Sequence, residues 1–156
     1  MVGVLLDTNI YGRFVEDGDA PELTKAIEND KGFIVHNFRI IRDELRRAKN
    51  ILPIYDRITT NNIITVNPFI EKLAKEYFNE YKKNEGVHKK DNNFMNDLRI
   101  IACASAKNFN LIFSDDKRSM HNEIAKNAYN EINLKYNLRT PTFHTYKDLK
   151  RKYLNK

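Results

Sequence analysis

Five acidic side chains lie at points of this sequence where a metal site could form: Asp7, Glu44, Asp97, Asp115 and Asp116. Asp7 directly follows an apolar run at residues 2–6, and Asp115 and Asp116 come just after the run at 111–113. Carboxylates that converge repel one another and raise each other's pKa unless a cation neutralises them. Oxygen ligands without Cys or paired His favour a hard cation, Mg²⁺ or Mn²⁺. One or two such ions can activate water and stabilise the charge that develops on a phosphodiester.

Each of these carboxylates also has a structural explanation. Asp7 is a common turn residue, Asp115 a common cap, Asp97 a charge favoured near a helix N-terminus, and Glu44 a surface residue. Each structural explanation is reasonable for its own residue. Applied to all of these residues at once they are less convincing, because several carboxylates would then lie at one edge of the fold by coincidence. Asp43 is an alternative to Glu44, since a shift of one residue turns a helical side chain by about 100°.

Strands and helices alternate along the chain. Apolar runs predict strands at 2–6, 32–36, 111–113 and 142–144, with an ambiguous run at 63–66. Helices are expected at about 21–30, 38–49, 70–81, 95–107 and 119–136, the last capped by Ser119, and a basic helix ends the chain. This alternation predicts an α/β protein with a mainly parallel sheet covered on both faces. In such sheets the functional crevice lies at the carboxyl ends of the strands, where Asp7, Asp115 and Asp116 fall.

Other chemistries lack their motifs. The four histidines are scattered and show no zinc spacing, and there is no nucleophile elbow, P-loop or dinucleotide fingerprint. His36 ends a predicted strand and is a candidate neighbour of the site, although a structural histidine is the simpler explanation. Cys103 cannot form an internal disulfide because it is the single cysteine, and its apolar surroundings predict a buried helix residue.

The composition predicts one globular domain spanning residues 1–156. Hydrophobic residues make up 41% of the chain and charged residues 31%, which excludes disordered and fibrous classes. No apolar run approaches the roughly 20 residues of a membrane helix, and no secretion signal is evident, so a cytoplasmic protein is expected. The polar stretch 82–93 is expected to be an exposed loop.

The positive charge is concentrated at the C-terminal end. The net charge is +6, and residues 135–156 hold seven Lys or Arg against Asp148 alone. A basic end on a neutral body suits RNA, which basic side chains hold through its phosphates. A surface that keeps the protein in solution is the simpler explanation of this charge. The basic end therefore supports RNA binding only if the rest of the chain carries residues that act on nucleic acid. The candidate RNA-binding residues are Lys147, Lys150, Arg151 and Lys152.

Four segments, in order along nearly the whole chain, resemble motifs of the PIN-domain nucleases, the family that includes the toxins of VapBC toxin–antitoxin pairs. "LLDTNIY" resembles the opening strand with its Asp-Thr-Asn, and "IRDELRR" resembles the helix that bears a glutamate. "NDLRIIACASAKNFNLIFSDD" resembles the closing signature, an Asp-headed helix of small residues and then a strand ending in Ser/Thr-x-Asp. "PTFHTYKDL" is similar to the final strand and helix. The opening and closing motifs are specific together and weak alone.

The resemblance implies a three-layer α/β/α sandwich with a mainly parallel central sheet, and metal-dependent cleavage of RNA. Carried over position by position, it makes Asp7, Glu44, Asp97 and Asp116 the acidic residues that hold one or two Mg²⁺ or Mn²⁺ ions. Asp115 fills a neighbouring position and is kept as a further contributor. The resemblance also implies that Asn9 holds Asp7 by hydrogen bonding and that Ser114 helps to orient the last Asp.

The expected function is therefore a metal-dependent endoribonuclease. Its more specific form is the toxin of a toxin–antitoxin pair, with RNA as substrate, an antitoxin protein as partner and a homodimer as assembly. The alternative is a catalytically inactive PIN-like module that binds RNA or protein. A phosphatase of the haloacid-dehalogenase type is less attractive, because that family needs Asp-x-Asp after its first strand and the third position here is Asn9.

Overall fold

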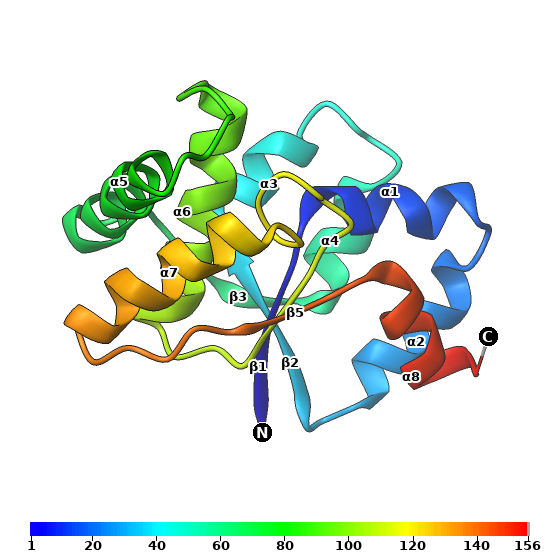
Figure 1. The fold of residues 1–156 in the computed structure, drawn as a ribbon. Helices are drawn as coiled ribbons and strands as arrows, with labels where there is room; N and C mark the ends of the chain where they lie inside the picture. The colour runs from blue at the N-terminus through cyan, green and yellow to red at the C-terminus, as the bar shows by residue number, and fades with distance from the viewer. Residues whose placement is uncertain (156) are drawn as a thin grey trace.

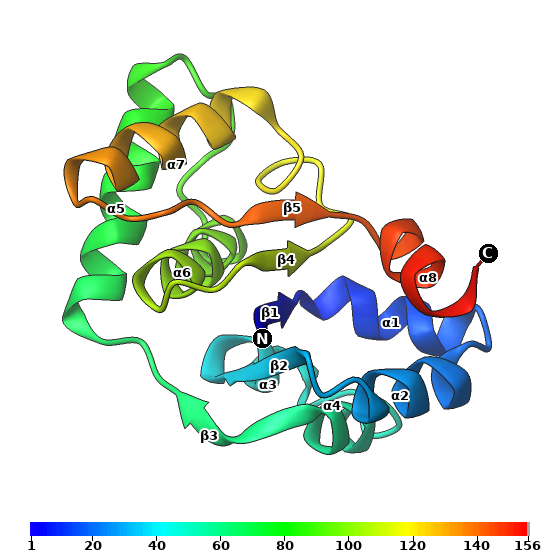
Figure 2. The ribbon, with the colours of Figure 1, turned by 90° about the horizontal axis from the view of Figure 1, so that it is seen from below.

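A computed structural model describes residues 1–155 and contains a five-stranded sheet in the order β3-β2-β1-β4-β5 (Figures 1 and 2). The strands are β1 (Val2–Leu6), β2 (Phe33–Phe38), β3 (Thr59–Ile64), β4 (Leu111–Phe113) and β5 (Thr142–His144). All four strand pairings are parallel, which confirms the sheet expected from the alternating pattern.

Helices cover both faces of this sheet. They are α1 (Thr8–Glu16), α2 (Ala20–Asn29), α3 (Arg39–Leu45), α4 (Leu52–Ile58), α5 (Pro68–Lys83), α6 (Asn92–Ala106), α7 (Glu123–Lys135) and α8 (Tyr146–Leu154). Helices α5, α6 and α7 lie on one side of the sheet, and α1, α2, α4 and α8 lie on the other (Figures 1 and 2). The expected three-layer α/β/α sandwich is confirmed.

The strand order reverses beside β1. From β1 the chain moves outward through β2 and β3, and it then returns to place β4 and β5 on the other side of β1. In doubly wound sheets, ligands bind at such a switch point, in the crevice outside the carboxyl ends of the strands. Here that point lies between the ends of β1 and β4, directly before Asp7 and Ser114.

The core follows the sequence pattern. Val4, Leu5 and Leu6 are fully buried, as a strand covered on both faces requires. One face of α5 packs against α6 and α7, and its buried residues are those that recur with helical spacing: Ile70, Leu73, Ala74, Tyr77, Phe78 and Tyr81. Cys103 is also buried, and burial raises the pKa of its thiol to about 12, in agreement with a structural role.

Two helices were not expected from the sequence. Helix α1 begins immediately after Asp7, in a segment that contains Gly12 and several β-branched and aromatic residues of modest helix propensity. Helix α4 is short, and it joins the end of α3 to β3. Tertiary packing stabilises both, since Ile10, Tyr11 and Phe14 in α1 and Tyr55 in α4 are fully buried.

Several boundaries also differ from expectation. Strand β2 continues to Phe38, so His36 lies inside the strand, where its ring stacks on Phe109 at 4.0 Å, rather than at the strand end. Helix α3 ends at Leu45 instead of 49. Helix α7 begins at Glu123 with Asn122 as its cap, so the expectation of a cap at Ser119 was wrong.

The polar loop between α5 and α6 is shorter than 82–93. Helix α5 continues to Lys83, and Asp91 caps α6 by accepting from the N–H of Phe94 at 2.8 Å, which leaves residues 84–91 as the connection. Its side chains are largely exposed, but Gly86 is buried against the ring of Tyr81, where a Cβ would clash. No helix within residues 1–155 has the length and apolar character needed to cross a membrane.

Candidate metal centre

Strand register places Asp7 next to Ser114. Leu6 pairs with Phe113, and the N–H of Asp7 extends the ladder by donating to the carbonyl of Phe113 at 2.9 Å. The next residue on each strand is therefore at the switch point. There the hydroxyl of Ser114 donates to Oδ2 of Asp7 at 2.7 Å, and both side chains are buried.

Two further hydrogen-bond donors hold Asp7. Its Oδ1 accepts from the N–H of Thr8 at 2.8 Å, which makes Asp7 the cap of α1. The amide of Asn9 donates to Oδ2 of Asp7 and to the Ser114 hydroxyl, each at 3.3 Å, and its Oδ1 accepts from the N–H of Asp115 at 3.1 Å. The residues after β1 and β4 are thus tied into one network, in which Asp7 is both the cap of α1 and a buried acceptor of hydrogen bonds.

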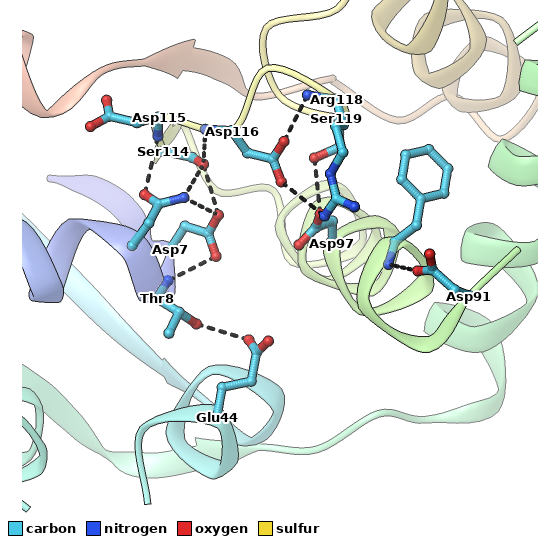
Figure 3. Close-up of polar contacts among 12 residues, drawn as sticks. Asp7, Thr8, Glu44, Asp91, Asp97, Ser114, Asp115, Asp116, Arg118 and Ser119 are labelled. Carbon is cyan, nitrogen blue, oxygen red and sulfur yellow. Dashed lines mark hydrogen bonds and ion pairs between the residues drawn. The ribbon is translucent and has the colours of Figure 1, made fainter. Parts of the chain in front are cut away.

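Asp97 and Asp116 form a second part of the centre (Figure 3). Asp97 lies in the second turn of α6, deeper into the helix than the sequence suggested, and is 8% exposed. Its carboxyl hydrogen-bonds to that of Asp116 and accepts from the buried Ser119 hydroxyl at 3.3 Å. This contact explains why Ser119 is not a helix cap. The N–H of Asp116 donates to Ser114 Oγ at 3.0 Å, which links this pair to Asp7.

Burial makes charge costly in this cluster. It raises the pKa of Asp97 to about 9, with added contributions from the carboxyls of Asp116 and Asp7. Burial also raises the pKa of Asp7 to about 6, against the opposing effect of the hydrogen bond from Ser114. Burial alone would raise the pKa of Asp116 as well, but hydrogen bonds from Asp97 and from the N–H of Arg118 outweigh it and lower that pKa. Asp97 therefore carries the proton of the pair.

Arg118 supplies a positive charge to the same two carboxyls. Its Nη2 lies 3.5 Å from Oδ2 of Asp97 and 3.7 Å from Oδ2 of Asp116, and its backbone N–H donates to Asp116 at 2.7 Å. In Figure 3 its guanidinium lies beside Asp97 and Asp116. Nothing in the sequence pattern pointed to Arg118, because its role depends on how the turn after β4 folds back toward α6.

Glu44 lies at the side of this cluster. It is exposed on α3, and its Oε1 accepts from the Thr8 hydroxyl at 2.8 Å, next to Asp7. Asp43 instead pairs with Arg46, the C-cap residue directly after α3, at 3.2 Å. Thr8 was missed by the sequence reasoning, although it is the central residue of the Asp-Thr-Asn motif.

Asp115 points away from the cluster (Figure 3). Its Oδ2 pairs with Arg13 at 2.9 Å, and its Oδ1 accepts from the N–H of Tyr146 at 2.9 Å. Both oxygens of Asp115 are thus occupied by α1 and by the start of α8. The structure brings Asp7, Asp97 and Asp116 together, with Glu44 adjacent, and leaves Asp115 on the opposite side of its loop.

The side chains of the centre are of the type that binds a hard divalent cation, but they are not close enough together to hold one. All candidate donors are carboxylate oxygens, the ligand type that Mg²⁺ and Mn²⁺ prefer. A proton on Asp97 and the charge of Arg118 now neutralise the buried cluster, which is what a bound cation would otherwise do. Within residues 1–155, however, no three His, Cys, Asp or Glu side chains lie close enough to hold one ion. Arg118 now lies 3.5 Å from Asp97, and the hydroxyl of Thr8 donates to Glu44 at 2.8 Å.

Most of the basic residues expected to contact RNA are ion-paired with neighbouring acids. Lys150 lies 3.1 Å from Asp19, and Lys152 lies 4.0 Å from Asp30. Arg151 pairs with Asp148 of its own helix at 3.5 Å. Of the four candidates, Lys147 makes no ion pair with any residue of 1–155.

The comparisons with known proteins reveal a shared fold. No protein-family model matches the chain, and no curated protein matches it in sequence. Among solved structures, it is similar to a chain of VapBC2 from Rickettsia felis, bound in that crystal structure to a DNA fragment from their promoter. The TM-score is 0.56 and the sequence identity 14%, over 92% of this chain and 98% of that chain. The PIN-like fold implied by the sequence resemblance is confirmed.

Proposed function

We propose that this protein is a single-domain, divalent-metal-dependent endoribonuclease that hydrolyses phosphodiester bonds. In this proposal Asp7, Glu44, Asp97 and Asp116 hold one or two Mg²⁺ or Mn²⁺ ions. The observation that carries the proposal is the meeting of Asp7, Asp97 and Asp116 at the switch point. They come from three separate elements, and burial raises the pKa of two of them to about 6 and about 9. Carboxyls whose pKa is strongly perturbed by burial and by neighbouring charges occur often at functional sites.

A bound divalent ion would supply a hydroxide nucleophile at neutral pH and stabilise charge on the phosphoryl oxygens. The protein's own contribution is to hold the ligands in place. Ser114 and Asn9 orient Asp7, and Ser119 orients Asp97, by the hydrogen bonds already described. Asp115 is left out of the proposed ligand set because Arg13 and the start of α8 bind both its oxygens.

We also propose that the protein acts as the toxin of a toxin–antitoxin pair. Its similarity to a VapBC2 chain over 92% of its length supports this more specific function. The expected partners are RNA as substrate, an antitoxin protein and a second copy of the chain.

A second candidate function is a PIN-like module that binds RNA or protein without cutting it. One observation favours it: Arg118 neutralises Asp97 and Asp116 at 3.5 Å and 3.7 Å, so the cluster has an internal cation already. If the guanidinium stays there permanently, it excludes the metal.

The deciding experiment is cleavage of labelled single-stranded RNA in Mn²⁺, with EDTA as the metal-free arm. Asp7→Asn should abolish cleavage, while asparagine preserves the cap of α1 and therefore the fold. Glu131→Gln is the matched control, because Glu131 is exposed on α7 and forms no ion pair within residues 1–155. Full activity in a clean Asp7→Asn preparation would refute the nuclease proposal, and RNA binding without any cutting by the wild type would favour the module.

A further inference from the structure

The loop after β4 presents different residues on its two sides. Asp116, Arg118 and Ser119 face Asp97 and belong to the carboxylate cluster. Asp115, Lys117 and His121 line a groove on the other side instead. Figure 3 shows Asp115 and Asp116 pointing in opposite directions from adjacent positions. The groove and the cluster are therefore separated by the thickness of one loop.

The groove is built from distant parts of the chain. Its volume is about 590 Å³, and its walls come from three parts of the chain: Arg13 of α1, the loop after β4, and Thr145 and Lys147 at the start of α8. His121 joins the groove to the cluster, because its Nε2 lies 2.7 Å from the carbonyl oxygen of Ser114, whose hydroxyl holds Asp7.

The groove has an excess of positive charge. Its one carboxylate, Asp115, is neutralised by Arg13 at 2.9 Å, and the guanidinium of Arg13 also lies over the ring of Tyr146, 4.9 Å from the ring centroid. Lys117 and Lys147 are both exposed, and neither forms an ion pair with any residue of 1–155. These two ammonium groups are therefore available to an anionic ligand, unlike the paired Lys150.

We propose that this groove binds the sugar–phosphate backbone of the RNA strand next to the bond that is cut, with Lys117 and Lys147 as its phosphate contacts. The inference rests on the proposed nuclease function for its choice of ligand. It adds an RNA-binding site to that function, because the same loop carries Asp116, a proposed metal ligand, and Lys117, a proposed phosphate contact. It also moves the expected RNA contact from the ion-paired face of α8 to the first turn of that helix.

The test is RNA binding without cleavage, measured by fluorescence anisotropy in EDTA with a labelled single strand of about 12 nucleotides. Lys117→Gln/Lys147→Gln is compared with Lys31→Gln/Lys107→Gln. The second pair removes the same charge from exposed sites before β2 and β4, at the opposite edge of the sheet. Salt is varied from about 50 to about 200 mM, because each phosphate contact contributes about 0.7 to the slope of log affinity against log salt for single strands.

The groove variant should bind about tenfold more weakly at the lowest salt, and its salt slope should fall by about 1.4, for two lost contacts. The control pair should keep the wild-type slope. Equal losses in the two variants, or no RNA binding by the wild type, would overturn the inference. The nuclease proposal is judged separately: a wild type that binds through Lys117 and Lys147 but never cuts RNA in Mn²⁺ supports the groove and refutes the nuclease.

Discussion

Replacing Asp97 with asparagine should stabilise the metal-free protein. In the wild type, burial together with Asp116 and Asp7 raises the pKa of Asp97 to about 9, so this carboxyl is protonated in the folded state at neutral pH. Asparagine imitates that neutral form: its amide can donate to Asp116, and its oxygen can accept from Ser119. The variant therefore keeps the hydrogen bonds and avoids the free-energy cost of taking up a proton.

The size of this effect depends on pH. The unfolded chain releases the Asp97 proton near the ordinary value of 3.8, and the folded chain releases it near 9. Between these values the folded state binds one proton more, so wild-type stability falls by about 1.4 kcal/mol per pH unit relative to the variant. At pH 7 the difference reaches about 4 kcal/mol, and below pH 4 it vanishes. For a domain of this size each kcal/mol raises Tm by about 2–4 °C.

Thermal unfolding in EDTA between about pH 4 and 9 measures this directly. Asp43→Asn serves as the control, since an exposed substitution should change stability by no more than about 0.5 kcal/mol at every pH. The reasoning fails if Asp97→Asn has the same Tm as the wild type at pH 7, or if its advantage does not grow with pH.

Two other substitutions test separate parts of the structure. Arg118→Gln should bind Mn²⁺ about tenfold more tightly in calorimetry, because it removes the cation that lies 3.5 Å from Asp97. The control Arg46→Gln should leave the Mn²⁺ affinity unchanged. An unchanged affinity in Arg118→Gln would mean that the guanidinium does not compete with the metal. Tyr55→Phe should lower the free energy of unfolding, measured by urea denaturation, by about 1–3 kcal/mol. The reason is that the buried Tyr55 hydroxyl donates to Asn37 at 2.9 Å and accepts from the N–H of Phe38 at 3.0 Å. A loss below about 0.5 kcal/mol would show that these hydrogen bonds do not contribute to stability.

Regular spacing made much of the fold predictable. The apolar run at 2–6 corresponds to β1, because a strand buried on both faces is apolar throughout, and the helical repeat from Ile70 to Tyr81 corresponds to α5, which is buried on one face. Helices α1 and α4 left little trace, since they are short and are stabilised by contacts with distant segments. The predicted first residues of α6 and α7 were wrong, because side-chain caps at Asp91 and Asn122 determine where those helices begin.

The sequence by itself predicted that Asp7 and the Asp115–Asp116 pair lie at one edge of the sheet, because residues that follow parallel strands must share that edge. It predicted Asp97 from its place near the start of a helix. It could not separate Asp115 from Asp116, because adjacent residues take opposite directions in a loop whose path depends on α1 and α8. It also could not reveal Arg118, which reaches Asp97 from 21 positions away. The three-dimensional structure alone decided which charges are paired. Lys150 lies close to Asp17 and Asp19, whereas Lys117 and Lys147 form no ion pair within residues 1–155. Pairing depends on distance in space, and a charge count along the chain contains no information about it.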